Sequence, residues 1–186
     1  MTHTAERRQL LHIARQAILE HVLGGRRVLE GSEPEGFSAR CGGAFVTLHA
    51  GRDLRGCIGY TEVDKPLFEV VARCAVAACS SDPRFSPITE AELPTLDIEV
   101  SLLGALEAIS GPADFEIGRH GLLVEKGRQR GLLLPQVAIQ WHWDRDQFLS
   151  QTCHKAGLPR DGWKDGARLW RFEAEVFSEA TTAPAV

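Results

Sequence analysis

The fold of this chain is decided by residues 44–60, which read AFVTLHAGRDLRGCIGY. Residues 44–50 and 54–60 are strand-like runs, and the segment Gly51-Arg52-Asp53 between them is typical of a short turn. Together they predict an antiparallel β-hairpin with a three-residue turn.

The turn length sets which residues of the hairpin face each other. This turn pairs His49 with Arg55 and Thr47 with Cys57, and it places all four side chains on one face. Arg55 and Cys57 are two residues apart on one strand, so their Cα atoms lie about 6–7 Å apart. A nearby cation favours the thiolate form of cysteine, and we therefore expect Cys57 to be the most reactive cysteine because of Arg55. The alternative is that Cys57 is a small core residue, because free cysteines are among the most often buried residues.

Gly56 and Gly59 interrupt the second strand of the hairpin. Glycine inside a strand often marks a β-bulge or a close approach of another backbone or a ligand. Two interpretations stay open: the glycines give a ligand room beside Cys57, or they form a tight seam that admits a helix against the sheet. A bulge at either glycine would also change the pairing of His49 with Arg55.

Elsewhere, helical and strand patterns alternate without a regular strand-helix-strand repeat. Helices are predicted over residues 4–22, from Pro66 to about Ser80 with Asp64 as cap, and from Asp144 to Gly157; strands are predicted over 96–102, 121–124, 131–134 and 169–177; residues from 179 onward are expected to be a frayed tail. This order predicts an α+β fold, a mostly antiparallel sheet flanked by helices, in a single domain spanning residues 1–186.

Composition narrows the class of protein. The chain has 186 residues, of which 44% are hydrophobic and 25% charged, as in globular domains. A net charge of −4 with scattered basic residues argues against nucleic-acid binding. No apolar run approaches the roughly 18 residues of a membrane span, and no signal peptide is present, so we expect a cytoplasmic protein. The five cysteines form no C-x-x-C pair and are expected to be free thiols.

A few other residues could contribute to a site. Glu99 and Ser101 point to the polar face of their predicted strand and could supply an acid or base, although a solvated strand face is the simpler alternative. Cys74 and Cys153 fall on apolar helix stripes and are expected in the core. The segment Trp141-His142-Trp143 is expected to be a packed aromatic cluster. No metal-type histidine spacing and no nucleotide-binding or hydrolase motif occurs, so neither a metal nor a cofactor is predicted.

The hairpin also resembles a known family. Leu54-Arg55-Gly56-Cys57-Ile58-Gly59 is similar to the six-residue signature of the AMMECR family, named for the chromosomal region linked to Alport syndrome, midface hypoplasia and elliptocytosis. Later motifs of the family have counterparts in the same order: Asp82-Pro83-Arg84-Phe85, Ile98-Glu99-Val100-Ser101, Leu133-Leu134-Pro135-Gln136-Val137, Trp143 and Cys153-His154-Lys155-Ala156-Gly157-Leu158. The resemblance covers about residues 8–178.

This resemblance implies a larger and a smaller subdomain packed together, with the six-residue signature lining a cleft. It also implies partners, because bacterial and archaeal members form one part of the three-component AmmeMemoRadiSam system. The other two parts are a Memo-like protein of dioxygenase-like fold and a radical-SAM protein. The resemblance implies no defined reaction.

Residues that would contact a substrate are carried over from the family motifs or added by the hairpin geometry. They are Gly56, Gly59, Arg84, Cys153 and His49. The family pattern commonly has another residue at the position of His49, so the resemblance does not imply a pairing of His49 with the signature cysteine.

Two main hypotheses of function follow. In the first, an enzyme-like site acts on an unknown small molecule, with Cys57 as a polarised thiol, Arg55 as an anion clamp and Glu99 as an acid or base. In the second, the protein is a non-catalytic module whose hairpin docks the Memo-like and radical-SAM proteins, and Cys57 is simply packed. A scaffold without a specific site is the third and least favoured hypothesis.

Overall fold

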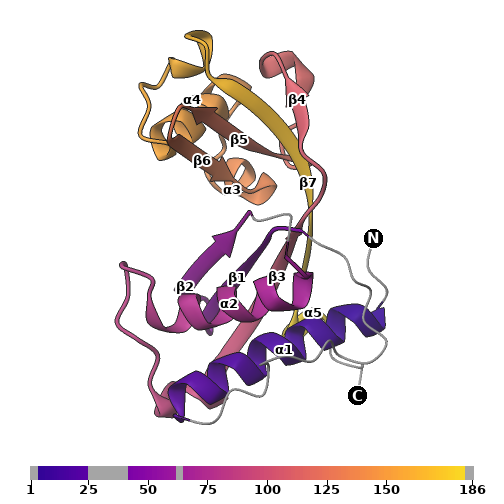
Figure 1. Cartoon of the computed structure of the whole chain (residues 1–186), viewed down its shortest axis with the longest axis vertical. Coiled ribbons are helices and arrows are strands. Elements are labelled where there is room, and N and C mark those ends of the chain that lie inside the picture. The colour runs from indigo at the N-terminus through magenta and orange to yellow at the C-terminus, as the bar shows by residue number, and fades with distance from the viewer. Residues whose placement is uncertain (1–3, 25–41, 62–64, 183–186) are drawn as a thin grey trace. The chain divides into compact units, whose positions relative to one another are not determined.

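The computed structural model of the chain describes residues 4–24, 42–61 and 65–182, and it combines helices with antiparallel strands (Figure 1). The predicted α+β fold is therefore confirmed. The chain divides into a larger unit 1, with residues up to Leu102 and from Glu175 onward, and a smaller unit 2, Leu103–Ala174. A larger and a smaller unit are what the family resemblance implies.

The sheet of unit 1 is built around the predicted hairpin. Strand β1 (Ala44–Ala50) lies at the centre, with β2 (Asp53–Tyr60) on one side and β3 (Leu96–Leu103) on the other. All neighbouring strands are antiparallel. Because successive side chains of a strand point to opposite faces, the central strand β1 presents one apolar face and one polar face.

Helix α2 (Leu67–Ser80) covers the apolar face of this sheet and shares its hydrophobic core. The helix follows Pro66, as the sequence predicted, whereas the expected cap Asp64 lies outside the described residues. The buried thiol of Cys74 donates a hydrogen bond to the carbonyl oxygen of Ala44 (3.2 Å). This cysteine is a core residue, as its place on the apolar stripe predicted.

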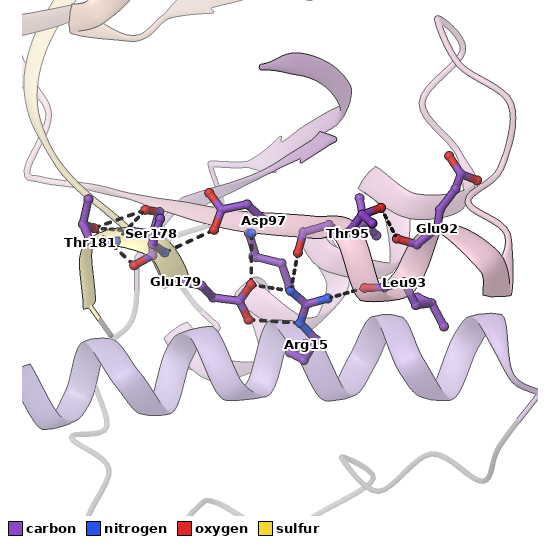
Figure 2. Close-up of polar contacts among 11 residues, drawn as sticks. Arg15, Glu92, Leu93, Thr95, Asp97, Ser178, Glu179 and Thr181 are labelled. Carbon is purple, nitrogen blue, oxygen red and sulfur yellow. Dashed lines mark hydrogen bonds and ion pairs between the residues drawn. The ribbon is translucent and has the colours of Figure 1, made fainter. Parts of the chain in front are cut away.

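Helix α1 (Thr4–Val22) packs its apolar stripe into the same core, in agreement with its periodicity. It also carries Arg15, whose guanidinium joins several segments of unit 1 (Figure 2). This guanidinium donates to the carbonyl oxygens of Leu93 (3.2 Å) and Leu96 (2.7 Å) and forms an ion pair with the carboxylate of Glu179. A single side chain therefore links α1 to the start of β3 and to the C-terminal segment.

The prediction of a frayed tail is wrong for the residues that follow the last strand, because they form the short helix α5 (Glu179–Thr182). Glu179 accepts a hydrogen bond from the backbone N–H of Ile98 (3.2 Å), and the N–H of Ala180 donates to the carboxylate of Asp97 (3.2 Å). These partners are 81 and 83 positions apart in the chain, so local sequence patterns hold no signal for them.

Unit 2 has its own antiparallel strands, in the order β4, β7, β5 and β6. Their bounds are β4 (Glu107–Ile109), β5 (His120–Lys126), β6 (Gln129–Leu133) and β7 (Arg168–Ser178), the last of which continues into unit 1. Strands β5 and β6 form the second predicted hairpin, and the turn places Gly127 at φ 61°. That backbone conformation favours glycine.

Two helices complete unit 2, α3 (Pro135–Gln140) and α4 (Arg145–Lys155). The N-terminus of α4 is capped as predicted, because the Asp144 carboxylate accepts a hydrogen bond from the N–H of Gln147 (2.8 Å). Short 3-10 helices lie at Glu90–Thr95, Pro112–Asp114 and Gly162–Lys164. None of the helices in the described part of the chain is long and apolar enough to cross a membrane.

The expected aromatic cluster of unit 2 is only partly packed. The rings of Trp141 and Trp143 are stacked, with centroids 6.1 Å apart. Trp141 nevertheless faces solvent, because its side chain is 66% exposed. Trp143 in turn contacts Phe148 of the core (6.5 Å between centroids). The two tryptophans therefore pack against each other, as predicted, but Trp141 remains largely exposed.

Candidate functional site

The hairpin register agrees with the prediction over most of its length and departs from it near the turn. Thr47 lies opposite Cys57, as predicted, but His49 lies opposite Leu54 and not Arg55. The pairing shifts between Leu48 and His49 because Arg55 is an extra residue in β2, which makes a β-bulge. The predicted pairing of His49 with Arg55 is therefore wrong.

One row of side chains crosses the polar face of the unit 1 sheet. Thr47 on the central strand β1 lies directly opposite Cys57 on β2. On its other side, Thr47 lies directly opposite Glu99 on β3. The hydroxyl of Thr47 donates a hydrogen bond to the sulfur of Cys57 (3.3 Å). Because neighbouring strands are about 4.8 Å apart, the Cα atoms of Cys57 and Glu99 are separated by about 10 Å. We call this surface of the sheet the Cys57 face.

Glu99 is partly buried on the Cys57 face, not simply solvated. Burial raises the pKa of the Glu99 carboxyl above its usual value. His49 opposes this increase in the pKa, and Asp97 adds to it. Two residues along β3, Ser101 is completely buried, and its hydroxyl has no hydrogen-bond partner among the described residues. Glu99 therefore keeps its proton to a higher pH than an exposed glutamate does, as a general acid requires.

A buried carboxylate fixes the backbone of Cys57. Asp82 follows the end of α2, and its carboxylate accepts hydrogen bonds from the N–H of Cys57 (2.8 Å) and from the N–H of Arg84 (3.1 Å). It also accepts two bonds from the guanidinium of Arg84, from Nε (2.9 Å) and Nη2 (2.7 Å). The hydrogen bonds from Arg84 hold the pKa of the Asp82 carboxyl well below its usual range, although burial opposes this effect. We call these contacts of Asp82 with Cys57 and Arg84 the Asp82 clamp.

Arg84 is the cation beside Cys57. Its Nη2 donates a second hydrogen bond to the carbonyl oxygen of Cys57 (3.3 Å), and half of its side chain is exposed. The carboxylate of Asp82 raises the pKa of Arg84, and the nearby side chain of Cys57 adds to this rise. The structure thus brings the predicted contact residue Arg84 to the thiol.

Arg55 has a different task from the predicted one. Its Nε donates to the carboxylate of Glu92 (2.7 Å), and its other nitrogens donate to the carbonyl oxygens of Ser86 (2.7 Å) and Pro87 (3.3 Å). The guanidinium of Arg55 and the N–H of Thr89 lower the pKa of Glu92 to about 2. Arg55 therefore joins the segment after α2 to the hairpin, and its guanidinium is paired with Glu92.

The two glycines of the signature make room for this chain itself. A Cβ atom at Gly56 would lie 2.2 Å from the carbonyl oxygen of Ala78 in α2, and one at Gly59 would lie 2.2 Å from the ring of Phe45. Real Cβ atoms do not come so close to other atoms, so Gly56 is required by the backbone of α2, and a side chain at Gly59 would have to displace the ring of Phe45. Of the two interpretations of Gly56, the tight seam between helix and sheet accounts for it without a ligand.

Cys57 differs from the other described thiols in its exposure. It is partly exposed, whereas Cys74, Cys79 and Cys153 are buried. Burial raises the pKa of Cys79 to about 11 and also raises the pKa of Cys153. The thiol of Cys153 has no exposed surface in the core of unit 2, so its predicted contact with a substrate is wrong. Cys41 lies outside the described residues.

Sequence reasoning quoted Asp82 within a family motif but assigned it no role. Its signal was local: an Asp-Pro-Arg segment directly after a helix allows the aspartate to accept the N–H two residues on. The role of Glu92 had no such signal, because its partner Arg55 lies 37 positions away. Among the described residues, no group of three or more histidine, cysteine, aspartate or glutamate side chains is arranged to hold a metal ion.

Comparison with known proteins shows which family this chain resembles in sequence and structure. The AMMECR1 family model matches residues 11–177. The chain is similar to a protein of Methanothermobacter thermautotrophicus, with 46% identity over 182 residues that cover 94% of each chain. It is also similar to protein MJ0810 of Methanocaldococcus jannaschii, with 42% identity over 88% of this chain and 86% of that one. The crystal structure of the uncharacterised protein PH0010 from Pyrococcus horikoshii has a TM-score of 0.86 and 39% identity, covering 95% of this chain and 93% of that chain.

The substitution Asp82→Asn tests the ionised state of the Asp82 clamp. An aspartate in an unfolded chain has a pKa of about 3.9, and that of Asp82 is lower in the fold, so its contribution to stability is complete above about pH 5. The contribution is lost as the pH falls through the lowered pKa. We expect Asp82→Asn to reduce the free energy of unfolding by about 2–4 kcal/mol at pH 7, and by progressively less below about pH 4.

Urea unfolding of both proteins over this pH range measures the difference. Asp53→Asn is the control, because Asp53 is an exposed aspartate on β2, the strand that carries Cys57, and it should change stability by less than about 0.5 kcal/mol. A loss in Asp82→Asn that stays constant down to pH 2 would contradict an ionised clamp.

Proposed function

The chain belongs to the AMMECR1 family, and we propose that it carries a thiol-dependent, enzyme-like site centred on Cys57. One observation supports this most: the partly exposed sulfur accepts a hydrogen bond from Thr47 and lies beside the guanidinium of Arg84. A hydrogen-bond donor and a cation beside an accessible sulfur are what the site of a nucleophilic cysteine requires.

The proposed chemistry is attack by this sulfur on an electrophilic carbon of a small molecule. The thiol proton of Cys57 passes to water, the thiolate forms the new sulfur–carbon bond, and the leaving group departs with the electrons of the bond that breaks. Glu99, whose pKa is raised by burial, can supply a proton to the leaving group from the same face of the sheet. His49 acts on the same carboxyl, because it lowers the pKa of Glu99.

In this proposal, Arg84 takes the role that the sequence assigned to Arg55. Asp82 is a positioning residue, because it holds both the backbone of Cys57 and the guanidinium of Arg84. We further propose that the protein works in the cytoplasm, where the four described free cysteines would stay reduced.

Alkylation by iodoacetamide tests whether Cys57 is the reactive thiol. In the native protein at pH 7, Cys57 should react at least about tenfold faster than Cys74, Cys79 and Cys153, because these three are buried. Peptide mass spectrometry gives the rate at each cysteine. Equal rates at Cys57 and the buried thiols would contradict the proposal.

Two matched variants then test whether Arg84 or Arg55 increases the reaction rate of Cys57. Arg84→Met should slow the reaction of Cys57 severalfold, since it removes the charge beside the sulfur. Arg55→Met removes an equal charge two residues from Cys57 on the same strand and should leave the rate nearly unchanged, because the guanidinium of Arg55 bonds to Glu92, Ser86 and Pro87 and not to Cys57. A slower reaction in Arg55→Met alone would restore the role that the sequence assigned to Arg55.

A second candidate function, docking to a Memo-like protein and a radical-SAM protein, is favoured by a different feature. Unit 2 exposes two large apolar side chains close together in sequence, Ile139 (53% exposed) and Trp141 (66% exposed). Exposed aromatic residues of this size are often the anchors of protein interfaces. We therefore propose that any docking surface is built on these residues and not on the glycines of the hairpin, whose space the chain itself fills.

Gel filtration with a Memo-like protein at micromolar concentration tests the docking proposal. We expect co-elution of the wild type, with an interface of roughly 1,200–2,000 Å², and its loss in Trp141→Ser. Leu23→Ser, at an exposed apolar residue of unit 1 (53% exposed), is the control and should still co-elute. Separate elution of the wild type and the Memo-like protein would contradict a stable complex.

A further inference from the structure

The guanidinium of Arg84 is only partly used by the contacts that hold it. Nε and Nη2 donate to the carboxylate of Asp82, and Nη2 also donates to the carbonyl oxygen of Cys57, which accounts for all the N–H groups of these two nitrogens. Nη1 has no hydrogen-bond partner among the described residues. Since half of the side chain is exposed, this nitrogen presents two unused donors of a cation to solvent.

These unused donors are held in a fixed direction. The carboxylate of Asp82 is 98% buried and binds one edge of the guanidinium through two nitrogens, while the ring of Phe85 lies 5.3 Å from the central carbon of Arg84. An arginine held in this way loses little conformational freedom when it binds a further group. The ion pair with Asp82 therefore orients Nη1 and leaves its donors available.

The position of Arg84 relates these donors to the reactive sulfur. Its guanidinium donates to the carbonyl oxygen of Cys57 and interacts electrostatically with the side chain of the same residue, so Nη1 belongs to a cation held beside Cys57. The other arginine of this region, Arg55, is bound to Glu92 and two carbonyl oxygens and does not offer the same free edge.

From this arrangement we infer that the small molecule attacked by Cys57 is an anion, whose carboxylate or phosphate group binds Nη1 of Arg84 close to the electrophilic carbon. The inference rests on the proposed function, because it names the substrate class of that same site. Anions bind arginine through charge-assisted hydrogen bonds, which are about twice as strong as neutral ones.

Iodoacetate and iodoacetamide form a matched pair of probes for this inference. They have the same leaving group and nearly the same size, and only iodoacetate carries a negative charge. With each probe, the sulfur of Cys57 forms a bond to the CH₂ carbon, iodide leaves with the electron pair of the carbon–iodine bond, and the thiol proton passes to water. The ratio of the two rates at Cys57 therefore isolates the contribution of the charge.

We expect the iodoacetate to iodoacetamide rate ratio at Cys57 to fall about tenfold in Arg84→Met, as lost charge-assisted contacts imply. Arg84→Lys, which retains a positive charge, should lose less, and Arg55→Met should keep the wild-type ratio. If Cys57 reacts with neither probe, the proposed function itself fails. If Cys57 reacts with both probes and the ratio is unchanged in Arg84→Met, the thiol site stands and the anionic substrate is excluded.

A competition experiment with the wild-type protein identifies which kind of anion binds beside Cys57. Acetate and inorganic phosphate are added separately at millimolar concentration while iodoacetamide labels Cys57. Slower labelling with acetate supports a carboxylate substrate, and slower labelling with phosphate supports a phosphate substrate. Labelling that is unaffected by either anion would contradict binding at Arg84.

Discussion

The candidate site depends on the buried carboxylate of Asp82. A buried charge is costly unless it is paired and hydrogen-bonded, and this carboxylate accepts bonds from the backbone of Cys57 and from the backbone and guanidinium of Arg84. The same charge therefore holds a strand of the sheet, the segment after α2 and the cation beside the sulfur. Without it, Arg84 would be an ordinary exposed arginine with no fixed relation to Cys57.

Four residues of the six-residue signature can be explained from the contacts around this clamp. Arg55 fastens the segment that contains Glu92, Gly56 admits the carbonyl oxygen of Ala78, and Gly59 admits the ring of Phe45. Ile58 packs against the hydrophobic core. Packing and anchoring therefore account for these positions without a ligand, and they leave the partly exposed sulfur of Cys57 as the group whose surroundings indicate chemistry.

The elements of the fold were predictable because they depend on local patterns. The alternation in residues 44–60 predicted the hairpin and the pairing of Thr47 with Cys57. The family motifs singled out Arg84, which lies against the backbone of Cys57. The bulge at Arg55 was not predictable, because a bond to Glu92 37 positions away fixes that side chain. For the same reason, the helix that begins at Glu179 was missed, since its anchors lie on β3 and α1.

The most direct test of this account is a crystal structure of the protein after reaction with iodoacetate. The account predicts a carboxymethyl group on Cys57, with a carboxylate oxygen within about 3.2 Å of Nη1 of Arg84. The bonds between Arg84 and Asp82 should be unchanged in that structure. An unmodified Cys57, or a carboxymethyl group that points to solvent while Arg84 contacts only Asp82, would contradict the central claim that Cys57 and Arg84 form one site.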